Sequence, residues 1–167
     1  MQYRKIHIIG GPGSGKTYIS NKLEKEIGIT AHDLDSVFWD LSENTYIRAS
    51  EELRTGKLSK ILSKSSWIIE GVYYKWLEES FRNADIIVIL NTPVITRQWR
   101  ILKRFLVRKF LLGEYRKETF SNFIELWQWN KKFDNDNMVR ICDVTSKYKE
   151  KVIYCEDYNE VMLSIKA

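Results

Sequence analysis

The stretch Gly10-Gly11-Pro12-Gly13-Ser14-Gly15-Lys16-Thr17 directly follows a short apolar run at residues 5–9. It satisfies the pattern G-x-x-x-x-G-K-[ST], and apolar residues recur after it at helical spacing up to Gly28. A glycine-rich turn between a strand and a helix lets backbone N–H groups and the helix N-terminus cradle phosphates. The sequence therefore predicts a strand, a phosphate-binding loop and a helix, and with them a nucleotide-binding protein.

Each part of this loop has an expected role. All eight residues from Gly10 to Thr17 are expected to contact the nucleotide, with the Lys16 ammonium on the phosphates as a catalytic charge. The Thr17 hydroxyl is expected to bind a magnesium ion that bridges the β- and γ-oxygens. A chance match in a glycine-rich turn is the alternative, and the strand and helix on either side argue against it. The motif leaves open whether the nucleotide is a substrate, a switch signal or an energy source.

Four further strand-like runs alternate with helical patterns along the chain. They lie at residues 30–34, 67–69, 85–90 and 151–155. Such alternation is typical of an α/β domain with a parallel sheet, here of five strands. Residues 36–49 are expected to form a loop, and Ser50 to begin a helix. With 167 residues, 44% of them hydrophobic, residues 1–167 are expected to form one domain.

Charge and composition limit the partners. A net charge of +5 favours anionic partners, such as nucleotides, phosphorylated metabolites or a nucleic-acid backbone. No apolar stretch approaches the length of a membrane span, and no signal peptide is recognisable, so we expect no membrane partner and a cytoplasmic location. Cys142 and Cys155 have no metal or redox spacing and are expected to be reduced thiols.

Three carboxylates are candidates for the chemistry next to the phosphates. Asp33 and Asp35 end the second strand, where their alternate spacing would place both side chains on one side of an extended backbone. We expect Asp35 to act as the base that takes a proton from an acceptor hydroxyl, and Asp33 to bind the metal through water. Glu70 follows the third strand at the same sheet edge and is a second metal candidate. The alternatives are a turn cap for either aspartate and a solvated strand end for Glu70.

A row of arginines follows Pro93. Its members recur on one helical stripe, with an apolar stripe opposite, namely Arg97, Arg100, Arg104 and Arg108 against Trp99, Leu102, Leu106 and Phe110. The pattern predicts a helix that packs by its apolar stripe and presents guanidinium groups to phosphate. Arg104 and Arg108 are the catalytic candidates, and a solvated basic face is the alternative.

The chain resembles the P-loop small-molecule kinase superfamily, and within it the adenylate-kinase-like proteins labelled DNA topology modulation or FlaR-like proteins. The resemblance rests on residues 8–17, Leu34-Asp35 with Phe38-Trp39, residues 67–73 and residues 123–129. It implies a three-layer P-loop NTPase fold with strand order 2-3-1-4-5, and ATP with Mg²⁺ as cofactors. It also implies an acceptor-binding insertion at about 36–66 and a helical arm at about 97–135. That arm would include an arginine-bearing lid near Arg97 to Lys117.

The leading hypothesis is an ATP-dependent kinase with a small-molecule acceptor, either a nucleotide or a hydroxyl metabolite. The spacing of Asp33 and Asp35 is similar to that of kinases acting on hydroxyl acceptors, such as shikimate or gluconate kinases. The second hypothesis is a nucleotide-regulated DNA-associated protein, although no DNA-reading module is recognisable. A slow NTPase switch is the third. The sequence is compatible with a monomer or a homodimer.

Overall fold

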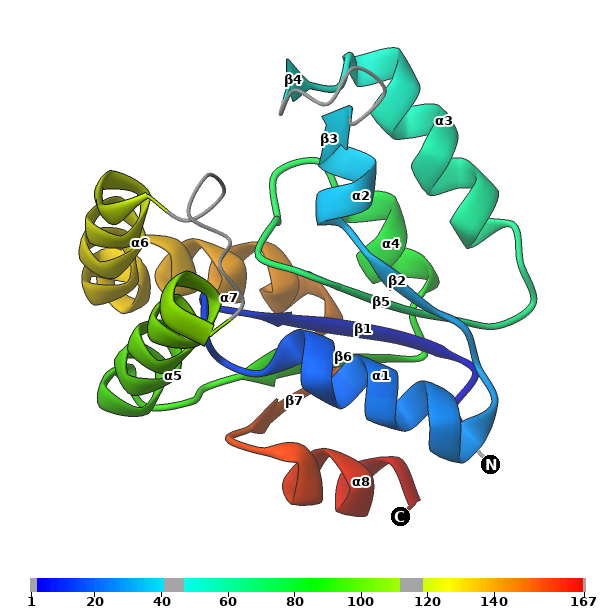
Figure 1. The fold of residues 1–167 in the computed structure, drawn as a ribbon. Helices are drawn as coiled ribbons and strands as arrows, with labels where there is room; N and C mark the ends of the chain where they lie inside the picture. Colours follow the sequence, from blue (N-terminus) through cyan, green and yellow to red (C-terminus); the bar gives the residue numbers. More distant parts are fainter. Residues whose placement is uncertain (1–2, 41–46, 112–118, 167) are drawn as a thin grey trace.

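A computed structural model describes residues 3–40, 47–111 and 119–166 of this protein. Its centre is a five-stranded parallel sheet in the order β2-β5-β1-β6-β7 (Figure 1). The strands are β1 (Lys5–Gly10), β2 (Ala31–Asp33), β5 (Trp67–Gly71), β6 (Ile86–Leu90) and β7 (Val152–Cys155). Counted along the chain these strands stand in the order 2-3-1-4-5, so the expected fold is confirmed.

The sheet is covered on both faces, which explains why its central strands are apolar without alternation. On one face, strand residues such as Ile6 and Val88 pack against α1 (Lys16–Ile27) and α8 (Tyr158–Lys166). On the other face, residues such as Ile69 and Ile87 pack with side chains of α3 (Glu51–Leu62), α4 (Glu78–Asn83) and α7 (Val139–Thr145). The result is the three-layer arrangement seen in Figure 1.

Local signals set several helix boundaries. Ser50 accepts a hydrogen bond from the Leu53 N–H and begins α3, as expected. Gly28 ends α1 with a φ of 67°, a conformation that favours glycine. The expected loop at 36–49 is wrong in part, because it contains α2 (Asp35–Phe38) and a small hairpin of β3 (Trp39–Asp40) and β4 (Ile47–Arg48).

The helical arm forms one end of the molecule (Figure 1). Its elements are α5 (Val94–Leu106), the π-helical turn η1 (Val107–Leu111), α6 (Phe120–Phe133) and the π-helical turn η2 (Asp134–Met138). Along the chain they are followed by α7 and the 3₁₀ segment η3 (Ser146–Lys151). Residues 41–46 of the expected insertion and 112–117 of the expected lid lie outside the described residues. None of the described helices is long and apolar enough to cross a membrane.

A buried histidine makes the stability of the fold sensitive to acid. His7 of β1 is fully buried against the Phe81 ring, and its Nδ1 lies 2.9 Å from the Ser80 Oγ. Burial lowers the pKa of His7 from 6.5 to about 3, so the folded state keeps the ring neutral where the unfolded chain is protonated. The unfolded state therefore binds more protons below pH 6.5, and stability falls as the pH falls towards 3.

Lowering the pH from about 7 to about 5 should thus cost about 2 kcal/mol through His7 alone. The measurement is urea unfolding of the wild type and His7→Gln across this range. We expect the unfolding free energy of the variant to fall less between about pH 7 and about pH 5 than that of the wild type. This difference is independent of the variant's stability at neutral pH. Parallel pH profiles for the two proteins would contradict the prediction.

Candidate active site

The phosphate-binding loop lies between the carboxyl end of β1 and the N-terminus of α1, as the sequence predicts. Gly13 and Gly15 have φ values of 74° and 98°, which side chains rarely tolerate. A Cβ on Gly11 would come within 2.8 Å of the Arg97 Nη1, and one on Gly13 within 2.7 Å of the Arg97 carbonyl oxygen. The glycines therefore leave room for a tightly curled loop.

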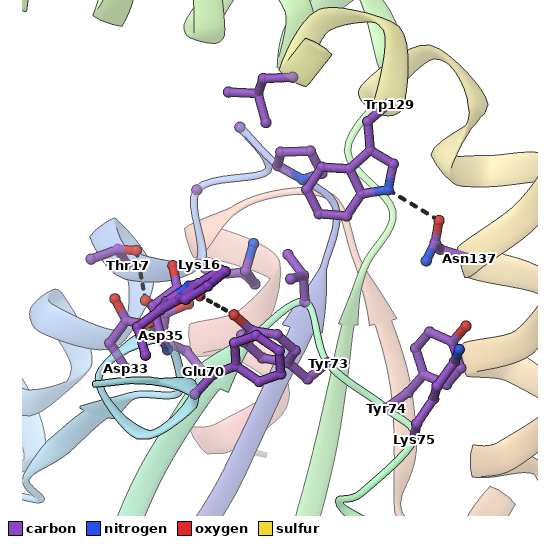
Figure 2. A pocket seen from close by; sticks show the side chains of 18 of the residues that line it. Lys16, Thr17, Asp33, Asp35, Glu70, Tyr73, Tyr74, Lys75, Trp129 and Asn137 are labelled. Carbon is purple, nitrogen blue, oxygen red and sulfur yellow. Dashed lines mark hydrogen bonds between the residues drawn. The ribbon is translucent and has the colours of Figure 1, made fainter. Parts of the chain in front are cut away.

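Lys16, Thr17 and Glu70 meet at the mouth of this loop (Figure 2). The Lys16 Nζ donates to the Gly11 carbonyl at 2.9 Å, and the Thr17 Oγ1 donates to the Glu70 Oε1 at 2.6 Å. Burial lowers the pKa of Lys16, while the charges of Glu70 and the two aspartates act in the opposite direction. Burial also raises the pKa of Glu70 to about 7, opposed by the Thr17 hydrogen bond and the Lys16 charge. Lys16 and Glu70 are thus buried groups of opposite charge type, and the exposed Thr17 lies beside them.

Asp33 and Asp35 both lie beside this cluster, but not in the expected way. Asp35 begins helix α2 and does not continue the strand, so the expectation of one extended backbone is wrong. The Asp33 Oδ1 accepts the Asp35 N–H at 2.8 Å, which makes Asp33 a turn cap as well as a pocket residue. The Asp35 Oδ1 accepts the Tyr73 hydroxyl at 2.7 Å. Burial and this hydrogen bond raise the pKa of Tyr73.

Side-chain oxygen atoms at the carboxyl edge of the sheet are suited to bind a magnesium ion whose other ligands are phosphate oxygens and water. Asp33 of β2 is the register partner of Glu70 in β5, and Glu70 accepts from the Thr17 hydroxyl. In the part of the chain that the structure describes, no group of three His, Cys, Asp or Glu is placed to hold a metal by itself. Magnesium commonly uses one or two protein oxygens and completes its shell with water and substrate phosphates. Thr17, Asp33 and Glu70 fit that mode of binding.

A pocket of about 1070 Å³ opens from the loop across the carboxyl edge of the sheet. Its volume is at the upper end for small-molecule sites. One wall carries aromatic and basic side chains, namely Phe38, Trp39, Arg48, Arg54, Tyr73 and Trp76. The facing wall comes from the arm, where the Trp129 Nε1 donates to Asn137 at 3.3 Å (Figure 2). The pocket therefore extends well beyond the phosphate loop.

The orientation of α5 corrects the prediction for the arginine row. Trp99 and Phe110 of the expected packing stripe are 65% and 64% exposed, whereas Arg97 is fully buried. The helix packs through Arg97, Ile101 and Phe105. The arginine side of the helix consequently faces the phosphate loop, with the apolar stripe turned outwards.

The arginines themselves divide into different positions. Arg100 donates to the Ser14 carbonyl at 2.8 Å and to the Gly13 carbonyl at 3.3 Å. Arg104 lines the pocket, and its charge adds to the effect of burial in lowering the pKa of Lys16. Arg108 lies in η1 and is not among the pocket residues. The structure thus brings Arg104 to the site and places Arg108 outside the lining.

A family model described as an AAA domain matches residues 6–109, which is more than half of the chain. The chain belongs to this AAA domain family. A relative, the uncharacterized protein YqaC of Bacillus subtilis (strain 168), is 28% identical over 138 residues, which cover 81% of this chain and 75% of YqaC. The likeness to YqaC extends past the AAA domain match but assigns no activity.

Two solved kinases share the fold of this AAA domain protein. Shikimate kinase from Bacteroides thetaiotaomicron has a TM-score of 0.52 and 15% identity, covering 98% of this chain and 95% of its own. A gluconokinase from Sinorhizobium meliloti 1021 has a TM-score of 0.50 and 12% identity, covering 90% of this chain and 81% of its own. The expected resemblance to P-loop kinases is therefore supported at the level of fold. Membership of the FlaR-like proteins stays a prediction.

The sequence pattern placed Arg97 of this AAA domain in the row expected to face phosphate and assigned no role to Asp134, its partner in the structure. The Arg97 Nη2 lies 2.7 Å from the Asp134 Oδ1 of η2, and the guanidinium lies over the Phe133 ring. Both packing partners come from the arm, while Gly11 and Gly13 contact the same arginine from the loop. Arg97 therefore connects the arm to the phosphate-binding loop, a contact that periodicity alone could not reveal.

Removing the partner of this buried charge should destabilise the fold. We expect Asp134→Ala to lower the free energy of unfolding by about 2 kcal/mol, less than for a fully buried pair because Asp134 is 37% exposed. Asp136→Ala, an exposed aspartate in the same turn, is the matched control and should change stability little. Denaturant unfolding compares the two variants. Equal losses of unfolding free energy would show that the Arg97–Asp134 pair does not stabilise the fold.

Proposed function

We propose that this protein transfers the γ-phosphoryl group of a nucleoside triphosphate, with ATP the expected donor, to a hydroxyl group of a small acceptor. The observation that carries the proposal is the meeting of a phosphate loop, Lys16, Asp35 and Arg104 around one pocket. The P-loop kinase fold supports it. A loop that bound nucleotide only as a switch would not require a second, aromatic and basic region in the same pocket.

In the proposed reaction, the chain mainly positions groups and compensates charge. Loop N–H groups and Lys16 would hold the phosphates, and Arg104 would approach the transferring group from α5. A magnesium ion held through Thr17, Asp33 and Glu70 would offset charge on the β- and γ-oxygens. The acceptor oxygen forms a bond to the γ-phosphorus as the bond to the bridging oxygen breaks. Asp35 takes the acceptor proton.

The electrostatics of the pocket favour a hydroxyl acceptor that also carries a negative charge. Two aspartates beside the transfer point would repel an acceptor phosphate there but would assist deprotonation of a hydroxyl. Farther along the pocket, Arg54 is only 7% exposed, and its Cζ lies 5.5 Å from the centroids of the Phe38 and Trp76 rings. Among the residues that the structure describes, its Nε has no hydrogen-bond partner. Arg54 is suited to bind an anionic group of the acceptor at that end.

The test is an acceptor panel assayed for ADP release and for phosphorylated product with ATP and magnesium. The panel contains nucleosides, nucleoside monophosphates, hydroxy acids and sugars, each with Lys16→Ala as the blank. Turnover that requires both an acceptor and Lys16 would support the kinase and define its acceptor class. Tight ATP binding with no product from any acceptor would argue for the switch instead.

Variants of Arg104 and Arg108 distinguish a kinase from a DNA-associated protein. In a kinase, Arg104→Gln should lower kcat by about 10²-fold while ATP binding persists, whereas Arg108→Gln should have a smaller effect because it lies outside the lining. In a DNA-binding protein both changes should weaken binding similarly and reduce its salt dependence. Turnover and DNA affinity of the two single variants are the measurements. Equal, small effects on turnover would remove Arg104 from the proposed mechanism.

A further inference from the structure

The arm carries an exposed apolar face that the proposed reaction does not use. We call it the α5–α6 face, and its residues are 38% to 81% exposed, namely Ile95, Trp99, Leu106, Phe110, Phe120 and Ile124. The four residues from α5 and η1 are spaced by 4, 7 and 4 positions, which places them on one stripe. This stripe is opposite the side that packs on the phosphate loop.

The two helices that carry these side chains pack against each other. They lie side by side at one end of the molecule (Figure 1), and the Phe105 and Phe123 rings stack at 4.5 Å between them. Phe120 lies 6.3 Å from the Phe105 ring, so the exposed part of α6 adjoins α5. A surface with this many large exposed apolar side chains indicates an interaction site.

The charges around the face are basic. From Val94 to Leu111 the chain has six lysines and arginines and no acidic residue. Lys103 is exposed beside the stripe, and the Lys109 Nζ lies 5.2 Å from the Phe105 ring centroid on its other side. On α6 the acidic Glu125 accepts a hydrogen bond from Ser121, while Lys131 and Lys132 follow near the end of the helix. The apolar stripe thus lies between cationic groups.

We propose that the α5–α6 face binds the surface of an anionic lipid membrane. A helix with an apolar stripe containing Trp and Phe, flanked by lysines, has the composition of an interfacial helix that lies in the headgroup region. Each lysine near such a surface gains attraction to anionic lipids. A second copy of the chain is disfavoured, because two-fold pairing of this face would bring lysines against lysines. This proposal differs from the expectation of no membrane partner. That expectation rested only on the lack of a recognisable membrane span or signal peptide in the sequence.

The test is co-sedimentation of the full chain with vesicles made of equal parts phosphatidylglycerol and phosphatidylcholine, and with pure phosphatidylcholine vesicles. Trp99→Gln with Phe110→Gln should lower binding to the anionic vesicles about tenfold without changing net charge. The matched control is Val139→Gln with Leu163→Gln, which removes two side chains that are 61% and 72% exposed elsewhere. It should bind like the wild type.

A second pair of variants tests the charges. Lys103→Gln with Lys109→Gln should lower binding roughly 10- to 30-fold. Lys25→Gln with Lys60→Gln, on α1 and α3, should lower it less. Three results would overturn the proposal: equal binding to anionic and neutral vesicles, equal losses in the test and control pairs, or a dimer in light scattering that the Trp99 and Phe110 changes convert to monomer. The last result would assign the face to a second copy.

Discussion

Lys16→Ala is expected to abolish acceptor-dependent turnover, lowering kcat by roughly 10³-fold. Lys16 is 8% exposed and contributes a positive charge where the phosphates of the donor would lie. Its Nζ donates to the Gly11 carbonyl, and its charge also lowers the pKa of the buried Glu70, which can take up a proton when that charge is removed. The fold should survive, and product formation under saturating ATP measures the loss.

Lys25→Ala is the matched control for this change. It removes an exposed lysine from the last turn of the same helix, far from the loop, and should leave turnover within about twofold of the wild type. Unfolding curves of both variants show whether either change affects stability. Substantial turnover by Lys16→Ala would mean that the phosphate loop does not serve phosphoryl transfer.

Asp35→Asn is the second change with a large expected effect. Loss of the proposed base should lower kcat by about 10²- to 10⁴-fold, with little change in ATP binding. The amide is isosteric and still can accept the Tyr73 hydroxyl, so the local geometry is expected to persist. Single-turnover phosphorylation of an acceptor separates this effect on transfer from any effect on product release.

Tyr73→Phe serves as a comparison for Asp35→Asn. It removes the hydroxyl that donates to Asp35 and keeps the ring that stacks on Phe38, so we expect at most about a tenfold effect. If Asp35→Asn were no worse than Tyr73→Phe, Asp35 would have an orienting role and another group would take the acceptor proton.

The sequence predicted the parts of this molecule that depend on local pattern. The strands are continuous apolar runs because they are buried on both faces, and the phosphate loop is marked by glycines that its backbone requires. The meeting of carboxylates at one edge of the sheet could also be predicted from the sequence. Parallel strands end at the same edge, and Asp33 and Glu70 are indeed register partners.

The failures have a common physical cause, which is packing between distant segments. The orientation of α5 could not be derived from its periodicity, which separates an arginine stripe from an apolar stripe and led to the wrong expectation that the apolar stripe packs. Contacts of Arg97 with the loop glycines and Asp134 decide the outcome. The hydrogen bonds of Arg100 to the loop and of Tyr73 to Asp35 likewise join residues 38 or more positions apart, beyond the range of local pattern.

The distribution of tryptophans gives the pocket an optical signal of its own. Of the six, Trp39, Trp76 and Trp129 line the pocket, whereas Trp67 is buried in the core. Indole emission depends on local polarity and on neighbouring charges, so nucleotide and acceptor should each alter the intrinsic fluorescence without a label. Trp129→Phe and Trp76→Phe would then distinguish a ligand seated against the arm from one seated against the opposite wall.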